Sequence, residues 1–331
     1  ALKPVGRYAF DNGELQMISS GMYFGFTFNG TVCSLQVSSP EQHNYLQYEL
    51  DGIYQKRIRV EKGNNGLIQI IAPKSGQHNV WIFKATEAHT GPVHIKKIEG
   101  QGLKALPAKQ ANLIEFIGNS ITCGAAADPS EVPCGTGAYH DQHNAYLAYG
   151  PRVARNLGSA FILSSVSGIG IYRNWNSNGP AMPLVYEKTS LRQEGKALWD
   201  FKQFTPRVVS IALGTNDFSN GDGKSERLPF DSAAFVQNYI SFVQLVKSKY
   251  KGTQIALLSS PMVHGSKAQL LQNCLTAVKN RVDAMKGDDK PVALFFFEPM
   301  QARGCTGHPN VEDHAIMANA LIPFFKNLLR P

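Results

Sequence analysis

Five short apolar runs, separated by longer segments with helical periodicity, constrain the fold of this chain more than any other feature. The runs cover residues 112–118, 161–166, 208–213, 254–260 and 292–298. One of the intervening segments places a single apolar stripe on Phe235, Val236, Tyr239, Ile240, Val243, Val246 and Tyr250. Buried strands that alternate with amphipathic helices are typical of a doubly wound parallel sheet. We therefore predict an α/β domain with five parallel strands.

The first 105 residues have a different pattern. Short alternating runs recur there at 22–30, 32–37, 45–50, 67–73, 79–86 and 93–100. Turn-forming pairs such as Asn29-Gly30 and Asp51-Gly52 fall between or after the runs, and no stretch has a sustained helical period. We predict an all-β sandwich over 1–105 and the α/β domain over 106–331, with the junction near 103–110.

Composition excludes several classes of protein. Hydrophobic residues make up 43% of the chain, but no window approaches eighteen uninterrupted apolar residues, so we expect no membrane span. The net charge of +8 is spread along the chain rather than gathered in one basic segment, so we expect no nucleic-acid partner. For the five cysteines two alternatives stand: a disulfide between Cys123 and Cys134, or five free thiols.

Four polar or glycine positions follow the predicted strands. Ser120 comes directly after the first strand, Gly168 follows the second, Asn216 follows the third, and His308 stands between the fifth strand and the last helix. Each has an ordinary structural explanation by itself: a helix cap, a turn glycine, an Asx-turn and a surface loop residue. Active sites of such sheets lie beyond the carboxyl ends of the strands. A nucleophile, two oxyanion donors and a base at one rim predict serine-dependent acyl transfer.

These positions resemble the four sequence blocks of the SGNH, or GDSL-type, hydrolases. The G-D-S block appears as Gly118-Asn119-Ser120, with Asn in place of Asp, and the second-block glycine matches Gly168. The G-x-N-D block matches Gly214-Thr215-Asn216-Asp217, and the terminal His-Pro matches His308-Pro309. The resemblance covers about residues 111–331.

A narrower resemblance is to carbohydrate esterase family 2, supported by the β-rich N-terminal half and by "IEFIGNSITCG", "NAYLAYG" and "GHPNVEDHAIMA". It implies a jelly-roll sandwich before the SGNH domain and removal of acetyl groups from xylan and glucomannan, preferably at sugar O6. Carried over by position, Ser120 is the nucleophile and His308 the general acid and base. The oxyanion hole comprises the Ser120 and Gly168 N–H groups and the Asn216 amide. No cofactor is implied.

One position departs from the SGNH pattern. Most of these enzymes have an Asp three residues before the catalytic His, and here that residue is Cys305. A thiol is a poor substitute for a carboxylate that orients an imidazole. Some members of family 2 lack this Asp and use a main-chain carbonyl instead. We predict that a backbone C=O in the 303–307 loop accepts the His308 Nδ1–H, with Glu298 as the less favoured alternative.

Substrate-binding residues are expected near the same rim. Trp175 follows Gly168 among polar neighbours and can stack on a sugar ring, and His264 follows the fourth strand. His140, Asp141 and His143 have a spacing that a metal ion could use, but we expect them in an open loop and predict no metal site. Whether the N-terminal sandwich binds glycan or only buttresses the site stays open.

The expected partner is an acetylated plant polysaccharide or oligosaccharide, and neither nucleic acid nor a membrane is expected. We expect a monomer that is secreted or displayed at the cell surface, extracellular or periplasmic, since the sequence opens at Ala1 as if a leader had been removed. Two alternatives are an SGNH lipase or thioesterase, and a carbohydrate-binding protein whose hydrolase domain is inactive.

Overall fold

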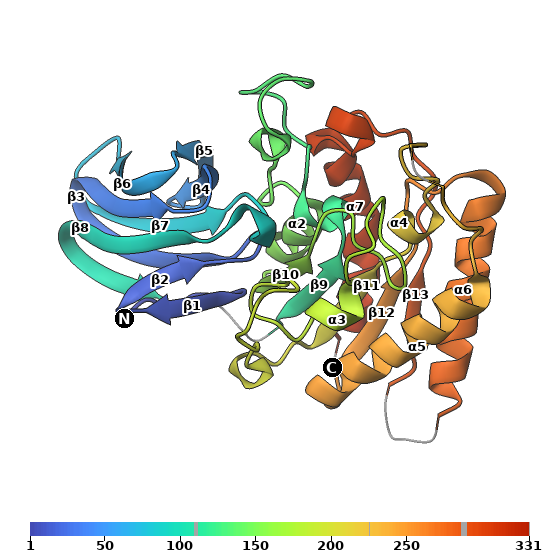
Figure 1. The fold of residues 1–331 in the computed structure, drawn as a ribbon. Coiled ribbons are helices and arrows are strands. Elements are labelled where there is room, and N and C mark those ends of the chain that lie inside the picture. The colour runs from blue at the N-terminus through green and yellow to red at the C-terminus, as the bar shows by residue number, and fades with distance from the viewer. Residues whose placement is uncertain (109–111, 225, 286–289, 331) are drawn as a thin grey trace.

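The structure, a computed structural model, describes residues 1–108, 112–224, 226–285 and 290–330. An all-β unit formed by the first part of the chain packs against an α/β unit formed by the rest (Figure 1). The predicted fold class is confirmed. The predicted boundary between 105 and 106 stays a prediction; strand β8 ends at Leu106, and the junction 103–110 lies partly outside the described residues.

The α/β unit contains a five-stranded sheet in the order β10-β9-β11-β12-β13, and every neighbouring pair is parallel. Its strands are β9 (Ile114–Gly118), β10 (Phe161–Ser165), β11 (Val208–Ala212), β12 (Gln254–Leu258) and β13 (Ala293–Phe295). Each strand lies within one of the five predicted apolar runs, which confirms them. The chain moves from β9 to one side for β10 and then to the other for β11, so the switch point of this sheet lies beside β9.

Helices cover both faces of the sheet. One face packs against α2 (Tyr149–Asn156) and α7 (Val311–Leu328), the other against α5 (Ser232–Lys249) and α6 (Gly265–Asp283). The predicted stripe on α5 is buried at Phe235, Tyr239, Ile240, Val243 and Val246. The remaining helices are short: α1 (Ser120–Cys123), α3 (Met182–Val185), α4 (Thr215–Phe218), and the 3-10 turns η1 (Ala88–Thr90), η2 (Tyr139–Gln142), η3 (Phe201–Gln203) and η4 (Cys305–Gly307).

The β unit has eight strands among the described residues: β1 (Tyr8–Asp11), β2 (Glu14–Met17), β3 (Tyr23–Ser39), β4 (Asn44–Leu50), β5 (Ile53–Val60), β6 (Gly63–Ile71), β7 (Gln77–Lys84) and β8 (Val93–Leu106). The expected turn at Asn29-Gly30 is wrong, because these residues lie inside the long strand β3. Before this point β3 pairs with β7, and after it β3 pairs with β6. The register of β3 against β8 shifts at the same point.

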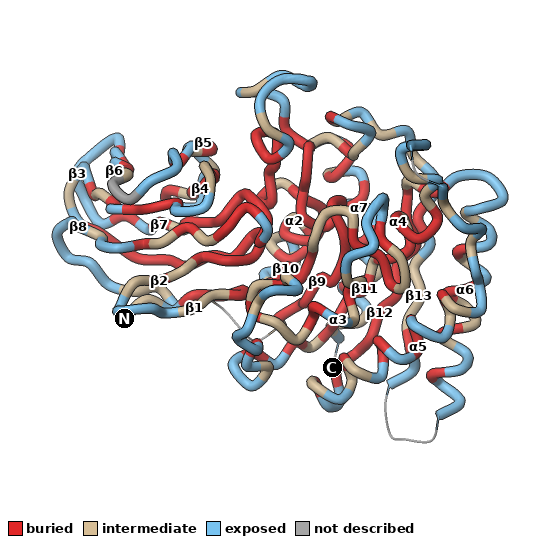
Figure 2. The backbone as a smooth tube through the Cα atoms, viewed as in Figure 1, coloured by how far each residue is buried: buried red, intermediate tan, exposed pale blue. Residues whose placement is uncertain are grey.

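The two units share a hydrophobic core. Tyr23 and Phe83 of the β unit pack in the same cluster as Phe161 of β10, and the Tyr23 and Phe161 rings stack with centroids 4.8 Å apart. Figure 2 shows buried segments in both units where they meet. The shared core fixes the β unit against the parallel sheet of the α/β unit.

Candidate active site

The turn after β9 presents Ser120 at the carboxyl edge of the sheet. Asn119 caps helix α1, and its side-chain oxygen accepts a hydrogen bond from the Ile121 N–H at 3.1 Å. Because Asn119 does the capping, Ser120 is the first helical residue and its hydroxyl is not needed as a cap. Gly118 is required by the tightness of this turn, since a Cβ there would lie 2.0 Å from Thr122 Oγ1.

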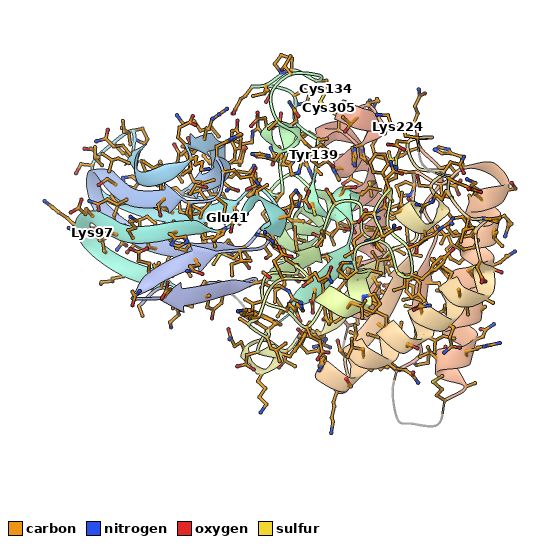
Figure 3. The ribbon with its side chains drawn as sticks, in the orientation of Figure 1. Glu41, Lys97, Cys134, Tyr139, Lys224 and Cys305 are labelled. Carbon is orange, nitrogen blue, oxygen red and sulfur yellow. A yellow bond between two sulfur atoms is a disulfide. The ribbon has the colours of Figure 1, made fainter. Side chains whose placement is uncertain are left out.

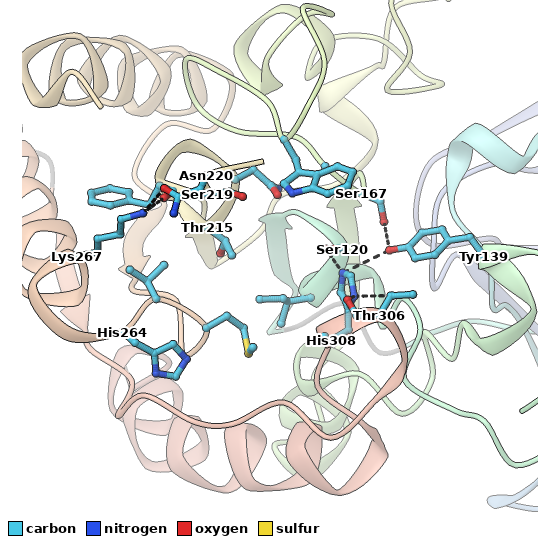
Figure 4. A pocket seen from close by; sticks show the side chains of 18 residues that line it. Ser120, Tyr139, Ser167, Thr215, Ser219, Asn220, His264, Lys267, Thr306 and His308 are labelled. Carbon is cyan, nitrogen blue, oxygen red and sulfur yellow. Dashed lines mark hydrogen bonds between the residues drawn. The ribbon is translucent and has the colours of Figure 1, made fainter. Parts of the chain in front are cut away.

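Ser120 and His308 meet at this edge, although 188 positions separate them in the sequence. The Ser120 Oγ lies 2.9 Å from His308 Nε2, which is a hydrogen-bond distance (Figure 4). His308 follows the short turn η4, and Asn310 caps α7 immediately after it. A hydroxyl bonded to an imidazole in this way can lose its proton as it attacks a carbonyl.

The other ring nitrogen of His308 faces Thr306. The His308 Nδ1 lies 3.2 Å from the Thr306 carbonyl oxygen and 3.1 Å from its hydroxyl. This confirms the predicted contact with a backbone carbonyl of the 303–307 loop. Thr306 has φ = 51°, a left-handed conformation that is uncommon for a β-branched residue. A donor at Nδ1 leaves Nε2 as the acceptor that a base requires.

Glu298, the alternative orienting group, is exposed and is not among the described residues that line the cavity beside Ser120 and His308. Replacing Glu298 with Gln is expected to leave kcat for ester hydrolysis within about twofold of the wild type, because the carboxylate contacts neither Ser120 nor His308. Steady-state kinetics of the purified variant measure this. A collapse of turnover in a folded Glu298→Gln protein would contradict the carbonyl-oriented arrangement.

Cys305, at the position of the usual Asp, forms a disulfide with Cys134 (Figure 3). Both sequence-based alternatives for the cysteines are therefore wrong. Cys123 is buried in α1, with its thiol 3.1 Å from the Ser165 hydroxyl, so it does not face Cys134. The disulfide bridges 171 positions and ties the turn before His308 to the segment that leads to Tyr139.

The predicted oxyanion donors surround the same cavity as Ser120. Gly168 lines it with φ = 75°, and Asn216 lines it from the start of α4. The Asn216 side-chain amide donates to the Ile169 carbonyl at 2.8 Å, which fixes the amide and leaves its second N–H for another acceptor. The Ser120 N–H lies in the first turn of a helix, where no intrahelical acceptor exists.

Three contacting residues were not predicted from the sequence. The Tyr139 hydroxyl lies 3.4 Å from His308 Nε2 and 3.2 Å from the Ser167 hydroxyl, and the buried Glu87 accepts a hydrogen bond from the Ser167 N–H at 2.6 Å. Tyr139 and Glu87 belong to segments without a motif, and Ser167 precedes the motif glycine Gly168 without being part of the motif. No sequence signal could have placed them at this site.

The cavity has a volume of about 700 Å³ and extends from the Ser120–His308 pair to His264 and Lys267 (Figure 4). Trp175 and His264, the two predicted substrate contacts, both line it. Trp175 is 44% exposed, so part of this residue is accessible to solvent in the cavity that Ser120 and His308 also line. Phe218, Met262 and Val263 contribute apolar side chains to its wall, beside polar side chains such as Asn220 and Lys267.

Models of known protein families match both units of the chain. Residues 116–312 match the model of the GDSL-like Lipase/Acylhydrolase family, and residues 4–108 match the carbohydrate esterase 2 N-terminal model. The chain belongs to the GDSL-like lipase/acylhydrolase family. Its N-terminal unit is of the kind found in carbohydrate esterase family 2, as the sequence resemblance predicted.

Relatives of this GDSL-like hydrolase match along most of its length. It is 31% identical to the cellulase/esterase CelE of Acetivibrio thermocellus over 98% of the chain, which spans 39% of that protein's length. It is 28% identical to an acetylxylan esterase / glucomannan deacetylase of Cellvibrio japonicus, over 91% of the chain and 82% of that protein. A family two carbohydrate esterase from Clostridium thermocellum, solved with cellohexaose, has a TM-score of 0.87 at 28% identity, with 99% of each chain covered.

The segment around His140 in this GDSL-like hydrolase differs from the predicted open loop. His140, Asp141 and His143 are buried at or beside the turn η2, because they pack against the β unit. His43, His140 and Asp141 place ligand-capable atoms within 4.8 Å of one another. Asp141 is already engaged, since it accepts hydrogen bonds from His43 at 2.5 Å, Tyr45 at 3.1 Å and the Ala138 N–H at 2.7 Å.

Burial lowers the pKa of the His308 imidazole below its ordinary value, although the carbonyl oxygens of Thr306 and Cys305 act in the opposite direction. Only the neutral imidazole can accept the serine proton, so a lowered pKa keeps the base functional to lower pH. In a pH profile of kcat/KM, the acidic limb of this hydrolase is expected to have its midpoint below about 6.5. A midpoint above that value would contradict the assignment of His308 as the base.

Among the described residues of this GDSL-like hydrolase, no helix has the length and apolar character that crossing a membrane requires.

Proposed function

We propose that this protein is a carbohydrate O-acetyl esterase that acts on plant polysaccharides such as xylan and glucomannan through a Ser120–His308 dyad. The observation that carries the proposal is the 2.9 Å contact between Ser120 Oγ and His308 Nε2, made at the rim of a cavity that also contains Gly168, Asn216 and Trp175. The names of the relatives and of the solved esterase add support for a carbohydrate ester as the substrate.

The proposed reaction has two steps with one acetyl-enzyme intermediate. Ser120 Oγ attacks the acetyl carbonyl while His308 Nε2 takes its proton, and the carbonyl oxygen becomes an oxyanion. The Ser120 N–H, the Gly168 N–H and the Asn216 amide stabilise that charge, and removing one such donor typically costs about 10²–10³ in kcat. The protonated His308 then gives its proton to the departing sugar oxygen, which leaves acetyl on Ser120.

Hydrolysis of the acetyl-enzyme reverses the roles. His308 takes a proton from water, the hydroxide attacks the acetyl carbonyl, and the second tetrahedral intermediate collapses to acetate as Ser120 recovers the proton. The Thr306 carbonyl holds the ring and stabilises its charged form through the Nδ1–H at 3.2 Å. No metal or cofactor is part of the proposed steps.

The acetyl group on O6 of a hexose is the proposed preferred substrate. This oxygen is exocyclic, so its acetyl group can reach Ser120 while the sugar ring rests against the exposed face of Trp175. The protein is proposed to work as a monomer outside the cell or in the periplasm, where plant polysaccharide is accessible to it.

Acetate release from acetylated xylan and acetylated glucomannan, beside turnover of a long-chain p-nitrophenyl ester, tests the function. Wild type is expected to release acetate from at least one polysaccharide and to hydrolyse the long-chain ester poorly. Strong long-chain turnover without acetate release would indicate a lipase or thioesterase. Failure to hydrolyse any ester, with retained affinity for the oligosaccharide, would indicate a binding protein with an inactive hydrolase domain.

A further inference from the structure

The β unit contributes one carboxylate to the surroundings of the catalytic pair. Glu87 follows strand β7, immediately before the turn η1, and its side chain is fully buried against the α/β unit. One carboxylate oxygen accepts from the Ser167 N–H at 2.6 Å. The other accepts from the Ser167 hydroxyl and from His143 Nε2, the latter at 2.9 Å. Ser167 is therefore held through its backbone and its side chain by a residue of the other unit.

Hydrogen bonds from buried side chains of the β unit hold the turn that contains Glu87. The ammonium group of the fully buried Lys84 donates to the carbonyl oxygens of Thr86 at 3.2 Å and Glu87 at 2.6 Å, and to the Thr90 hydroxyl at 3.3 Å. The Thr90 hydroxyl lies 2.7 Å from the Glu87 carbonyl oxygen and 2.6 Å from Asn44 Oδ1, and its single hydrogen can be donated to either acceptor. These bonds leave the Glu87 backbone little freedom, so the position of its carboxylate is set by the β unit.

The two hydrogen bonds of the His143 ring assign it one neutral tautomer. Its Nδ1 accepts from the Ala126 N–H at 3.2 Å, so the ring hydrogen resides on Nε2 and is donated to Glu87. Burial lowers the pKa of His143, which keeps this form. Burial alone would raise the pKa of the Glu87 carboxyl, but the nearby His89 and the His143 hydrogen bond hold it well below its ordinary value. Glu87 is thus an ionised acceptor of three hydrogen bonds, and the oxygen that accepts from the Ser167 N–H also lies 3.4 Å from His89 Nδ1.

Ser167 lies between this carboxylate and the reacting groups. Its own backbone is followed directly by Gly168, whose N–H is a proposed oxyanion donor, and its hydroxyl contacts Tyr139 at 3.2 Å. Since the Ser167 hydroxyl gives its single hydrogen to Glu87, Tyr139 is the donor in the contact between them. The Tyr139 oxygen in turn lies 3.4 Å from His308 Nε2. A displacement of Ser167 would therefore move the Gly168 N–H of the proposed oxyanion hole and the Tyr139 hydroxyl that lies beside His308.

We infer that Glu87 is a positioning residue of the catalytic site, through which the β unit fixes the Ser167–Gly168 peptide in the orientation that the oxyanion requires. The inference rests on the proposed acyl-transfer function. It also gives the N-terminal unit a role in turnover, since one of its side chains supports the active site of the α/β unit.

The test is Glu87→Gln, a change that preserves size but offers one acceptor oxygen and an NH₂ group to three donors. Ser167 then loses one of its two bonds to residue 87. We expect kcat for acetyl-ester hydrolysis to fall by about 10–10²-fold with KM within about twofold, as for partial loss of an oxyanion donor. Affinity for a boronic acid, which forms a tetrahedral anion on the serine, should fall in parallel. Affinity for the deacetylated oligosaccharide should stay unchanged.

Glu115→Gln is the matched control. Glu115 is a second fully buried carboxylate at the contact between the two units; it accepts from Ser164 at 2.6 Å and from Tyr186 at 3.1 Å, and it lies 3.9 Å from Arg7. Its neutralisation is expected to lower thermal stability without changing kcat of the folded protein. Equal kcat in Glu87→Gln and wild type, or equal loss of boronate and oligosaccharide affinity, would overturn the inference.

If Glu87→Gln does not fold, Ser167→Ala removes the hydroxyl bonds to Glu87 and Tyr139 and leaves the backbone bond. Its kcat is expected to fall several-fold at unchanged KM, and a wild-type kcat would overturn the inference. Failure of the wild type to hydrolyse any acetyl ester would be a failure of the proposed function instead, so the two outcomes are distinct.

Discussion

Replacing Ser120 with alanine is expected to lower kcat for acetyl-ester hydrolysis by about 10⁴-fold or more, because no acetyl-enzyme can form without the hydroxyl. Initial rates of acetate release measure the change. The variant should fold normally, since Asn119 rather than Ser120 caps α1. It should also bind the deacetylated oligosaccharide as tightly as the wild type, since the cavity wall formed by Trp175 and His264 is untouched.

Ser248→Ala is a suitable control, because Ser248 is exposed on α5 and its hydroxyl bonds only to the Leu245 carbonyl among the described residues. It should show wild-type kinetics. If Ser120→Ala retained more than about a tenth of the wild-type kcat, a covalent mechanism at this residue would be untenable.

His308→Ala is the second change with a large expected effect. Loss of the imidazole at 2.9 Å from Ser120 Oγ removes the one base that lies within hydrogen-bond distance of this hydroxyl among the described residues. We expect kcat to fall by about 10⁴-fold or more, with the acidic limb of the pH profile lost from the residual activity. Steady-state rates between acidic and neutral pH measure both effects.

In the proposed mechanism Ser120 and His308 act together, so the losses of kcat from the two substitutions should not multiply in the double variant. The Ser120→Ala, His308→Ala double variant is expected to be no slower than either single variant, since each alone already stops proton transfer to or from the nucleophile. A product of the two single effects in the double variant would instead show that Ser120 and His308 act independently, contrary to the proposed dyad.

The strands and the rim positions could be predicted because they depend on local order along the chain. Each apolar run is long enough for one buried strand, and the residues that follow parallel strands must reach one edge of the sheet. Ser120, Gly168, Asn216 and His308 therefore come to line one cavity. The contact between His308 and a loop carbonyl could also be anticipated, because Cys305 replaces the usual Asp and the resemblance to carbohydrate esterase family 2 implies a main-chain carbonyl in its place.

Contacts between distant segments could not be predicted in the same way. The partner of Cys134 is 171 positions away, and only the folded loops reveal that Cys305 and not Cys123 faces it. Glu87 reaches Ser167 across 80 positions and across the contact of two units. In the β unit, Asn29-Gly30 has the composition of a turn, but β3 continues through it because it has partners on both sides of the break.

Covalent labelling of Ser120 tests the central claim most directly. Treatment with an alkyl phosphonofluoridate, followed by peptide mass spectrometry, should place one phosphonyl group on Ser120 of the wild type. Labelling of His308→Ala should be slower by about 10³-fold or more, because the hydroxyl is then no longer activated. A label on another residue, or an equal labelling rate in the two proteins, would contradict a nucleophile at 120 that depends on the base at 308.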